Sequence, residues 1–536
     1  MDTYTFTTAG GGASHTITDP LGTVRTYGQS LIQNGYRETS ESGLCAHCGG
    51  DAARGYDANG NITSRTDFNG RHITYVYDQD RNLETSRTEA SGTPRARTIT
   101  TSWDPYWRRP SLITEANRTT GFTYDSNGNL LTKTVTDTSV TPNVSRVWTY
   151  TYDGNNRMLT ADGPRTDVSD VTTYTYYTCT TGFQCGQVQT VTDAAGNVTT
   201  YNSYNAHGQP LSITDSNGVV TTLTYDLRQR LTSRTTAGEG TSFSYYPTRL
   251  LHTVTLPDGS FISYTYDGAH RLTQVTDGSG NKVVYTLDAM GNRTAENVYD
   301  PTSALHRTHS RVINSLDQLY KDVNAAGASV TTTFGYDSNG NQTSVGAPLS
   351  RTTANQFDEL NRLKQITDPA SGVTQLGYDA NDNLTSVSDP RSLTTSYTYN
   401  GFGDLRTQVS PDTGTTTNTY DTGGNLATAV DARGATATYA YDALNRVTSV
   451  AYSQGGTTDQ TISYSYDSGT NGKGHLVGAS DANHIRCPRA SDLEEPDRGQ
   501  RRAFDELWLH QCGSHFPRYR LRADSRLRLQ RESPGN

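Results

Sequence analysis

Residues 378–399 read YDANDNLTSVSDPRSLTTSYTY, and this stretch decides the fold. It contains two segments rich in Asp, Asn, Pro and Ser, 378–383 and 389–392, which are typical of tight turns. The segments that follow them, 384–387 and 393–399, alternate apolar and polar residues, a pattern that predicts β-strands. We therefore predict two strands and two turns in 21 residues. The residues that we place on one face of the second strand are Leu393, Thr395, Tyr397 and Tyr399.

The same unit recurs along most of the chain with a period of 21 residues. The positions that carry the longest unbroken run are Tyr336, Phe357, Tyr378, Tyr399, Tyr420 and Tyr441, each followed by Asp or Asn. A period of this length indicates a repeat architecture, in which one unit cannot bury its apolar face alone. We therefore expect roughly forty strands in all, with the Tyr and Leu side chains of neighbouring units forming one continuous layer. We interpret the repeated Tyr as structural.

The composition supports an all-β chain and excludes several classes of function. The 536 residues include 50 Gly and 34 Tyr but only 3 Met, which suits many short strands joined by tight turns. The net charge of −9 does not fit a nucleic-acid-binding protein, and no apolar run is long enough for a transmembrane helix. The N-terminus has no signal-peptide pattern. We expect a protein that is cytoplasmic before export, or secreted or surface-bound by a route independent of a signal peptide.

The six cysteines are too few for a disulfide framework, so we expect reduced thiols. Cys45 and Cys48 form a Cys-x-x-Cys pair, which alone is a weak signal for zinc because a structural zinc site needs four ligands. Cys179 and Cys185 could in principle complete such a site, but they lie far away with a different spacing. We prefer a turn with unreactive thiols over zinc or a redox pair, and we predict no metal, no cofactor and no catalytic residue.

Turns that begin at Asp57 and Asp125 resemble the start of a calcium loop. The twelfth position of an EF-hand loop must be Glu, and here it is Phe68 or Thr136, so we interpret both segments as turns. The sequence also contains no nucleophile elbow, phosphate-binding loop or zinc-protease motif. We therefore predict that the chain is not an enzyme.

The last 53 residues differ from the rest. Residues 484–536 contain 11 Arg and no Thr, and the repeat stops before them. We divide the chain into a repeat region, 1–483, and an aperiodic tail, 484–536. His510, Cys512 and His515 lie close together in the tail and could be ligands or a base, but the flanking carboxylates or zinc-ligand pairs of a nuclease are missing. We prefer the hypothesis that the tail arises from a reading-frame shift and is disordered.

The repeat resembles the YD repeat of bacterial Rhs proteins. The residues that carry the resemblance are Tyr-Asp-x-x-x-Arg-Leu-Thr at 266–273, the Thr-Asp-x-x-Gly turn at 276–280, and Tyr-Asp-x-x-x-Arg-Val-Thr at 441–448. The resemblance covers residues 1–483. It implies a β-strand spiral that forms part of a hollow shell, or cocoon, with about two strands per 21-residue repeat. It also implies a shell that encloses a C-terminal toxin, delivered with a secretion-system spike or adaptor, often of type VI, in interbacterial competition.

The chain departs from that family pattern in two ways. It has no Rhs-type delivery domain before the repeats and no autocleavage core after them, so we expect a truncated fragment that lacks the toxin. Two other hypotheses remain open. One is a cell-surface YD-repeat protein that binds carbohydrate or a neighbouring cell, and the other is a toxin activity located in the tail.

Overall fold

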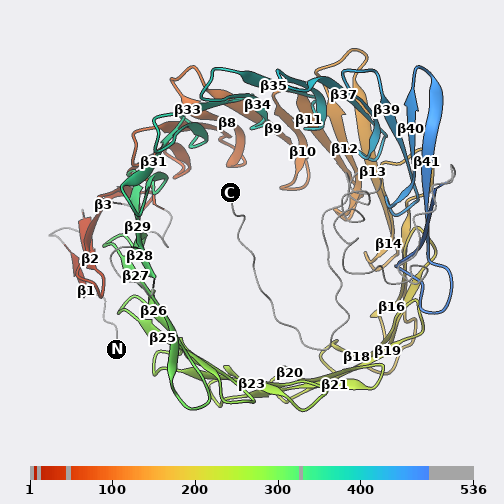
Figure 1. Cartoon of the computed structure of the whole chain (residues 1–536), viewed down its shortest axis with the longest axis horizontal. Helices are drawn as coiled ribbons and strands as arrows, with labels where there is room; N and C mark the ends of the chain where they lie inside the picture. Colours follow the sequence, from red (N-terminus) through yellow and green to blue (C-terminus); the bar gives the residue numbers. More distant parts are fainter. Residues whose placement is uncertain (1–4, 9–13, 44–49, 325–329, 482–536) are drawn as a thin grey trace, which may run out of the picture. The chain divides into compact units, whose positions relative to one another are not determined.

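The computed structural model describes residues 5–8, 14–43, 50–324 and 330–481. In these residues it contains 42 strands in one sheet and no α-helix. Every strand from β1 to β40 pairs antiparallel with the next strand along the chain, so the sheet is a continuous meander (Figure 1). The predicted all-β fold and the predicted number of strands are confirmed.

The strands of the first half are β1 Thr5–Thr8, β2 Ser14–Thr18, β3 Val24–Ile32, β4 Gly35–Glu41, β5 Ala53–Tyr56, β6 Ile62–Thr66, β7 His72–Asp78, β8 Leu83–Ser91, β9 Arg97–Trp103, β10 Pro110–Glu115, β11 Arg118–Tyr124, β12 Leu130–Asp137, β13 Val144–Tyr152, β14 Met158–Asp162, β15 Thr172–Tyr176, β16 Val188–Thr192, β17 Val198–Tyr204, β18 Pro210–Thr214, β19 Val220–Tyr225, β20 Leu231–Thr236 and β21 Glu239–Tyr245. Those of the second half are β22 Leu251–Thr255, β23 Phe261–Tyr266, β24 Leu272–Asp277, β25 Lys282–Leu287, β26 Arg293–Tyr299, β27 Leu305–Ile313, β28 Leu319–Asn324, β29 Thr331–Tyr336, β30 Gln342–Ala347, β31 Arg351–Phe357, β32 Leu363–Thr367, β33 Val373–Tyr378, β34 Leu384–Ser388, β35 Thr394–Tyr399, β36 Leu405–Ser410, β37 Gly414–Tyr420, β38 Leu426–Val430, β39 Thr436–Tyr441, β40 Val447–Gln454, β41 Thr457–Tyr466 and β42 Leu476–Asp481.

The turns that follow the repeated Tyr, here called YD turns, are fixed by the Asp side chain. Asp379 Oδ1 accepts the backbone N–H groups of Asn381 and Asn383, each at 2.9 Å. Asp382 adopts a φ of 66°, and the register shifts by one residue directly before Tyr378. This is the three-residue hairpin loop with a bulge, for which Asp, Asn and Gly are the favoured residues. The repeat thus encodes a turn and a bulge together.

The turns at the other ends of the strands, here called TD turns, use the same chemistry. Asp389 Oδ1 accepts the N–H groups of Arg391 and Leu393, each at 2.9 Å, and Ser392 adopts a φ of 65°. Because the strands alternate in direction, odd-numbered strands lead into YD turns and even-numbered strands lead into TD turns. The sheet therefore has two long edges, one lined by YD turns and the other by TD turns.

The repeated Tyr joins each hairpin to the one before it. Tyr378 donates its hydroxyl to the carbonyl oxygen of Leu363, the first residue of the preceding strand β32, at 2.8 Å. The paired positions of β32 and β33 run only from Thr367 to Gln365 on the first of these strands, so this bond closes the end of the pair that the ladder leaves open. The tyrosines that make the equivalent bond include Tyr124, Tyr152, Tyr176, Tyr204, Tyr245, Tyr336, Tyr420, Tyr441 and Tyr466.

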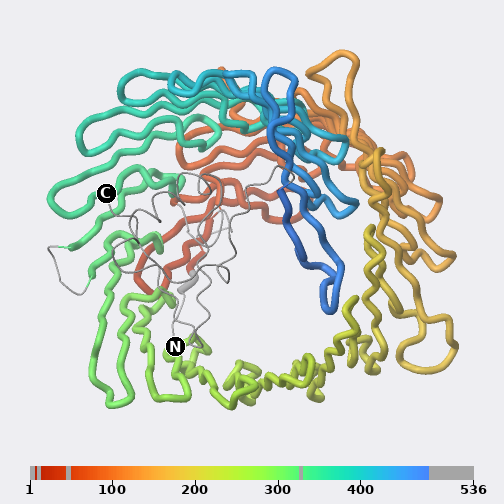
Figure 2. The backbone as a smooth tube through the Cα atoms, turned by 45° about the vertical axis from the view of Figure 1, so that its right-hand side comes forward, coloured from red at the N-terminus to blue at the C-terminus, as the bar shows by residue number. Residues whose placement is uncertain are grey.

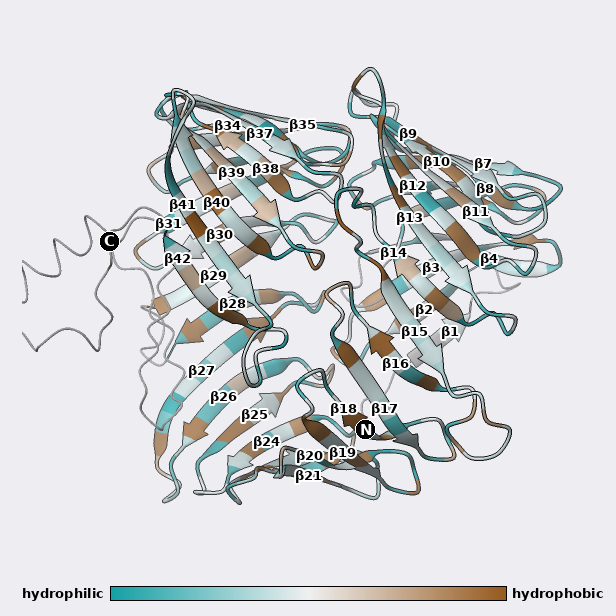
Figure 3. Cartoon of the chain, turned by 90° about the vertical axis from the view of Figure 1, so that its right-hand side faces the viewer, coloured by the Kyte–Doolittle hydropathy of each residue, from teal (hydrophilic) through white to brown (hydrophobic). Residues whose placement is uncertain are grey.

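The two faces of the sheet differ in chemistry. One face carries cross-strand hydroxyl pairs, such as Thr151 with Thr160 and Thr398 with Thr407, whose oxygens lie 2.6 Å apart. The other face carries apolar pairs, which the register places opposite one another: Tyr174 with Val191, Tyr201 with Ile213, Phe243 with Val254, Tyr264 with Val275, Phe334 with Val345 and Leu376 with Val387. Hydrophobic segments accordingly recur between hydrophilic ones along the strands (Figure 3).

The predicted Tyr and Leu ladder exists, but it is not a closed core. Among the described residues, the buried apolar side chains are those of Leu83, Ala90, Tyr204 and Val450. Most other residues of the apolar face are half-buried, because neighbouring side chains cover their flanks while no second layer of the described chain covers their tips. The expectation of a continuous buried layer is corrected in this respect: lateral packing within one sheet replaces packing between two layers.

The sheet of residues 5–480 also curls back on itself. Strands β29–β39, drawn in green to blue, lie beside β3–β13, drawn in red to orange, in both views (Figures 1 and 2). We call β2–β18 the first coil and β27–β41 the second coil. The predicted spiral is therefore confirmed, and the contact between its coils decides the arrangement described in the next section.

Removing one tyrosine hydroxyl tests its role in joining hairpins. Tyr420→Phe deletes the bond from Tyr420 to Leu405 O, which is 2.9 Å long. We expect unfolding free energy to fall by about 1 kcal/mol, the usual net worth of one such bond. Urea denaturation followed by far-ultraviolet circular dichroism measures it. Tyr452→Phe, at a more exposed ring, is the control; equal losses in both variants would contradict the role.

Alkaline pH tests the burial of the same tyrosines. Burial raises the pKa of Tyr204 to about 12 and also raises that of Tyr378 and Tyr420. A phenol in an unfolded chain ionises near about pH 10. The folded state therefore binds the proton more tightly, so its stability is complete below about pH 10 and falls as pH rises toward 12. Phenolate absorbance and circular dichroism should change together in this window; full phenol ionisation in a chain that stays folded would contradict it.

Candidate functional site: the seam between the two coils

The two coils meet along a seam of turns. TD turns of the first coil contact YD turns of the second coil, and the residues so joined are between 256 and 292 positions apart in sequence. The first of these contacts is Thr23 Oγ1 to Ser315 O, and the last is the reciprocal pair of Asn217 and Lys473. One coil therefore takes close to thirteen repeats of 21 residues. The contacts join the TD edge of the first coil to the YD edge of the second coil, so the coils stack head to tail.

Asn and Asp side chains form one part of the seam. Asn69, in the third position of its TD turn, donates its amide to Asp337 Oδ2 at 2.9 Å. Asn339, in the third position of the facing YD turn, donates to Asp67 Oδ2 at 2.6 Å. The two turns are thus related by a reciprocal pair of amide–carboxylate bonds.

Arginines of the first coil form the second part of the seam. Arg146 donates to Asp404 Oδ2 at 2.5 Å, and its guanidinium lies 4.0 Å from the centre of the Phe402 ring. Arg97 pairs with Asp382 at 2.7 Å and also donates to the carbonyl oxygen of Ala380. A guanidinium suits this place because it can bind an oxygen and stack on a ring at once.

Arg165 is the most buried of these arginines. Its side chain is 2% exposed and comes from the loop between β14 and β15. It donates to Asp442 O at 3.0 Å and to Asn445 Oδ1 at 3.1 Å in the second coil, and it binds Asp167 of its own loop at 2.5 Å. The hydrogen bond from Arg165 lowers the pKa of the Asp167 carboxyl. Asp421, in the neighbouring YD turn, lies 3.7 Å away. One cation therefore holds two turns of the second coil.

The seam is electrostatically complementary. The first coil supplies guanidinium groups, and the second supplies carboxylate, carbonyl and amide oxygens. A cavity of about 190 Å³ lies on the seam, lined by charges of both signs that include Arg65, Arg97 and Glu89. Within it Arg97 pairs with Glu89 at 2.7 Å, so the charges satisfy each other. The arrangement is suited to holding two edges together.

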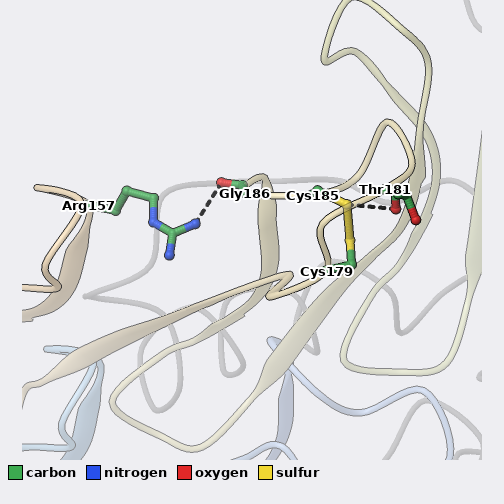
Figure 4. The surroundings of a disulfide bond; sticks show 5 residues. All are labelled: Arg157, Cys179, Thr181, Cys185 and Gly186. Atoms are coloured by element: carbon green, nitrogen blue, oxygen red, sulfur yellow. Dashed lines mark hydrogen bonds between the residues drawn. A yellow bond between two sulfur atoms is a disulfide. The ribbon is translucent and has the colours of Figure 1, made fainter.

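Cys179 and Cys185 are joined by a disulfide, so the expectation of reduced thiols is wrong for this pair (Figure 4). They lie in a loop, 177–187, that replaces the usual short YD turn after β15, and this loop brings their Cα atoms within 5.1 Å, a normal separation for a disulfide. Gly186 O at the end of the loop accepts a bond from Arg157 of the preceding YD turn at 3.1 Å. The bridge removes both thiols from the zinc alternative. It also cross-links this loop, whose ends are joined by a hydrogen bond from the backbone N–H of Tyr177 to Gln187 O at 3.0 Å.

The other predicted residues have different outcomes. Asp57 Oδ1 accepts two backbone N–H groups, from Asn59 and Asn61, which is the predicted turn. Asp125 binds in the same way. Cys45, Cys48, His510, Cys512 and His515 lie outside the described residues, as does the tail from 484, so the hypotheses about them remain predictions. Among residues 5–481 that the structure describes, no helix is long and apolar enough to cross a membrane.

The seam itself was not predicted from the sequence. A sequence signal for part of it is the choice of residue at the third position of the turns, where Asn69, Asn217 and Phe402 face the other coil. That position varies more than the Tyr and Asp on either side of it, and its partners lie thirteen repeats away. The residue pattern within one repeat therefore could not identify the seam.

Comparison with known families agrees with this architecture. A family described as RHS Repeat matches residues 56–94, 378–416 and 420–458, and a family described as Teneurin YD-shell matches residues 180–392. These parts of the chain are YD repeats (RHS repeats). A comparison of this YD-repeat chain with curated protein sequences gives no match.

Solved structures similar to this YD-repeat protein include complexes of TcdB2 and TccC3. The crystal structure of TcdB2-TccC3-Cdc42 has a TM-score of 0.48 at 13% identity over 88% of this chain, and that of TcdB2-TccC3 has a TM-score of 0.48 at 13% identity over 84%. The Tc holotoxin pore of Photorhabdus luminescens, with a TccC3-D651A mutation, has a TM-score of 0.42 at 12% identity over 87%. The chain covers 31%, 31% and 33% of those chains, so it spans about a third of their length.

Removing the buried arginine tests the seam. In Arg165→Ala the hydrogen bonds to Asp442 O and Asn445 Oδ1 are lost. Bonds to a charged group are worth about 1.5–3 kcal/mol, so we expect amide exchange in turns 421–425 and 442–446 to rise about ten- to a hundredfold. Hydrogen–deuterium exchange with mass spectrometry measures this.

The control for that experiment is Arg391→Ala. Arg391 forms a similar ion pair with Asp389, but its side chain is 69% exposed and lies on the free edge of the second coil. We expect no change of exchange in the two seam turns of this variant. Unchanged exchange in Arg165→Ala would show that Arg165 does not hold the coils together.

Proposed function

We propose that this YD-repeat chain is a segment of a shell that encloses a C-terminal toxin polypeptide in an Rhs-type delivery protein. A structural shell role follows from the family matches and from the coiled sheet. The enclosed toxin, its processing and its delivery concern a whole protein of this kind. The similar solved chains are about three times as long as this chain.

The observation that carries the proposal is the apolar face of the sheet. Phe243 and Val254 lie opposite each other on this face, as do Tyr264 and Val275 in the next repeat. A row of such half-buried pairs without a covering layer is an extended apolar surface, and such surfaces mark binding sites. An unfolded polypeptide, which exposes its own apolar side chains, would cover this surface and gain free energy by doing so.

The seam supports the same role. A single-layer sheet that faces an enclosed chain must not unroll, and the first coil holds the second through groups such as Arg146 and Arg165. Hydrogen bonds between the coils also satisfy the turn carboxylates, which would otherwise be available to bind the enclosed chain. The facing edges of the two coils are in this way held together, as the wall of a shell requires.

The disulfide supports the proposal that the protein functions outside a reducing compartment. Bonds such as Cys179–Cys185 persist in oxidising environments and are rare in reducing ones. A protein exported to the cell surface or beyond meets that condition. A secretion apparatus and an adaptor belong to this proposal as partners, and type VI secretion is one route.

Binding of an unfolded polypeptide tests the proposal directly. The probe is a reduced and carboxymethylated polypeptide, which cannot fold, carrying a fluorescent label. We expect the wild-type chain to bind it and raise its fluorescence anisotropy, and we expect Phe243→Asp to weaken binding because a charge on the apolar face must be desolvated. No binding to the wild type would overturn the proposal.

Adjacent residues on opposite faces give a matched control. Ser244 follows Phe243 in β21 and pairs with Thr253 on the hydroxyl face. Ser244→Asp adds the same charge to the same strand, and we expect it to bind the probe as the wild type does. Equal loss in both variants would show that binding does not depend on the apolar face. Binding of oligosaccharides in place of the polypeptide would favour the carbohydrate-binding alternative.

A further inference from the structure

The TD turns of the second coil form a free edge that has the features of the seam. In the described part of the chain, the hydrogen bonds and ion pairs of turns 389–393 and 431–435 stay within those turns. Arg391 and Arg433 occupy the third position of these turns, and their side chains are 69% and 79% exposed. This is the position from which Asn69 contacts the other coil.

Each of these arginines is folded back on its own turn. Arg391 binds Asp389 and Arg433 binds Asp431, each at 2.7 Å. Exposed pairs of this kind contribute little to stability, so the guanidinium groups can exchange partners at small cost. In the seam, by contrast, Arg146 reaches across to bind an acidic turn and stack on Phe402.

The YD turns of the first coil form the complementary free edge. Tyr106 stands in the third position of the turn after β9 and is 88% exposed. Phe402 has the same place in its own YD turn, where Arg146 covers it. Asp104, the first residue of the Tyr106 turn, corresponds to Asn400, and an exposed carboxylate, Asp80, lies in the YD turn before it. The turn also carries the exposed Arg108, so the feature that a guanidinium can recognise here is the open face of the Tyr106 ring.

We propose that the free TD edge of one copy of this chain docks on the free YD edge of a second copy, with Arg433 stacked on Tyr106. The contact continues the seam, since it joins the same two kinds of turn in the same direction. The proposal goes beyond the shell role and does not depend on an enclosed polypeptide.

The direction of the seam fixes the neighbouring contacts. Along the seam, later TD turns meet later YD turns, as in the pairs Asn69 with Asp337 and Asn217 with Lys473. With Arg433 on Tyr106, the TD turn before it therefore places Asp412 at the YD turn that contains Arg81. One turn further back, Arg391 meets the turn that begins at Asp57. Opposite charges face each other where Arg391 meets Asp57, whereas Asp412 meets a turn that carries Asp78 and Asp80 together with Arg81.

Because the two edges are unlike, the contact is head to tail and does not close after two copies. We therefore expect the mass of the wild-type particle to rise steadily with concentration above that of the 58.4 kDa chain, as sedimentation velocity or light scattering would measure. The association should weaken with added salt, since the contact is exposed to solvent. A wild-type chain that remains monomeric at all concentrations would overturn the proposal.

Two variants, mixed, give the decisive test. Arg433→Ala removes one side of the contact and Tyr106→Ala removes the other, so each alone should be monomeric. In an equal mixture, Arg433 of the Tyr106→Ala chain can still dock on Tyr106 of the Arg433→Ala chain. The mixture should therefore form dimers and nothing larger. A mixture that stays monomeric, or variants that assemble like the wild type, would contradict the proposal.

The control variant is Arg234→Ala. Arg234 lies in the middle of β20, opposite Leu223 and Thr241, and so belongs to neither edge. It removes the same charge as Arg433→Ala, and we expect it to assemble like the wild type. Circular dichroism of all variants confirms that they are folded. Loss of assembly in Arg234→Ala would show that net charge, and not the docking edge, drives association.

Discussion

The carboxylate of the turn aspartate is the group on which the rest of this structure depends. It accepts two backbone N–H groups, as Asp379 does from Asn381 and Asn383, and so sets the loop length, the left-handed residue and the bulge. A fixed loop length fixes the register of each hairpin, because a slip of one residue would exchange the two faces of the strand. The uniform apolar and hydroxyl faces therefore originate in the turns.

A sheet of one layer must be stabilised differently from a globular core. The apolar residues of this sheet are mostly half-buried, so burial contributes less for each residue than it would between two packed layers. Lateral contacts take its place. Tyr378 bonds to the preceding hairpin, Arg362 lies 4.8 Å from the centre of the Tyr378 ring, and threonine hydroxyls pair across the opposite face. Each contact is local, which allows the sheet to extend by adding repeats without changing its construction.

The same turns acquire a second role once the sheet curls. Residues such as Asn69 and Asn339, which are not needed to form their own turns, become the contacts between coils. The disulfide loop is an instructive exception. After β15 the sequence has no Asp turn. A longer loop stands there and is cross-linked by the Cys179–Cys185 disulfide. Both observations indicate that the residue types vary at the edges of the sheet, while its two faces keep the same residue types.

The sequence by itself determined the strands, the turns and their order. Tyr, Asp and the alternating residues act within one hairpin, so Tyr378 and Leu384 could be placed without knowledge of the rest of the chain. Tertiary structure alone decided the seam and the disulfide. The partners of Arg165 lie some 280 residues away, and which turn it meets depends on the curvature summed over thirteen repeats. Two cysteines six residues apart likewise bond only because the loop between them folds back, a geometry that spacing does not fix. Local interactions repeat and can be read from the sequence, whereas the contacts between coils depend on how all of the repeats add together.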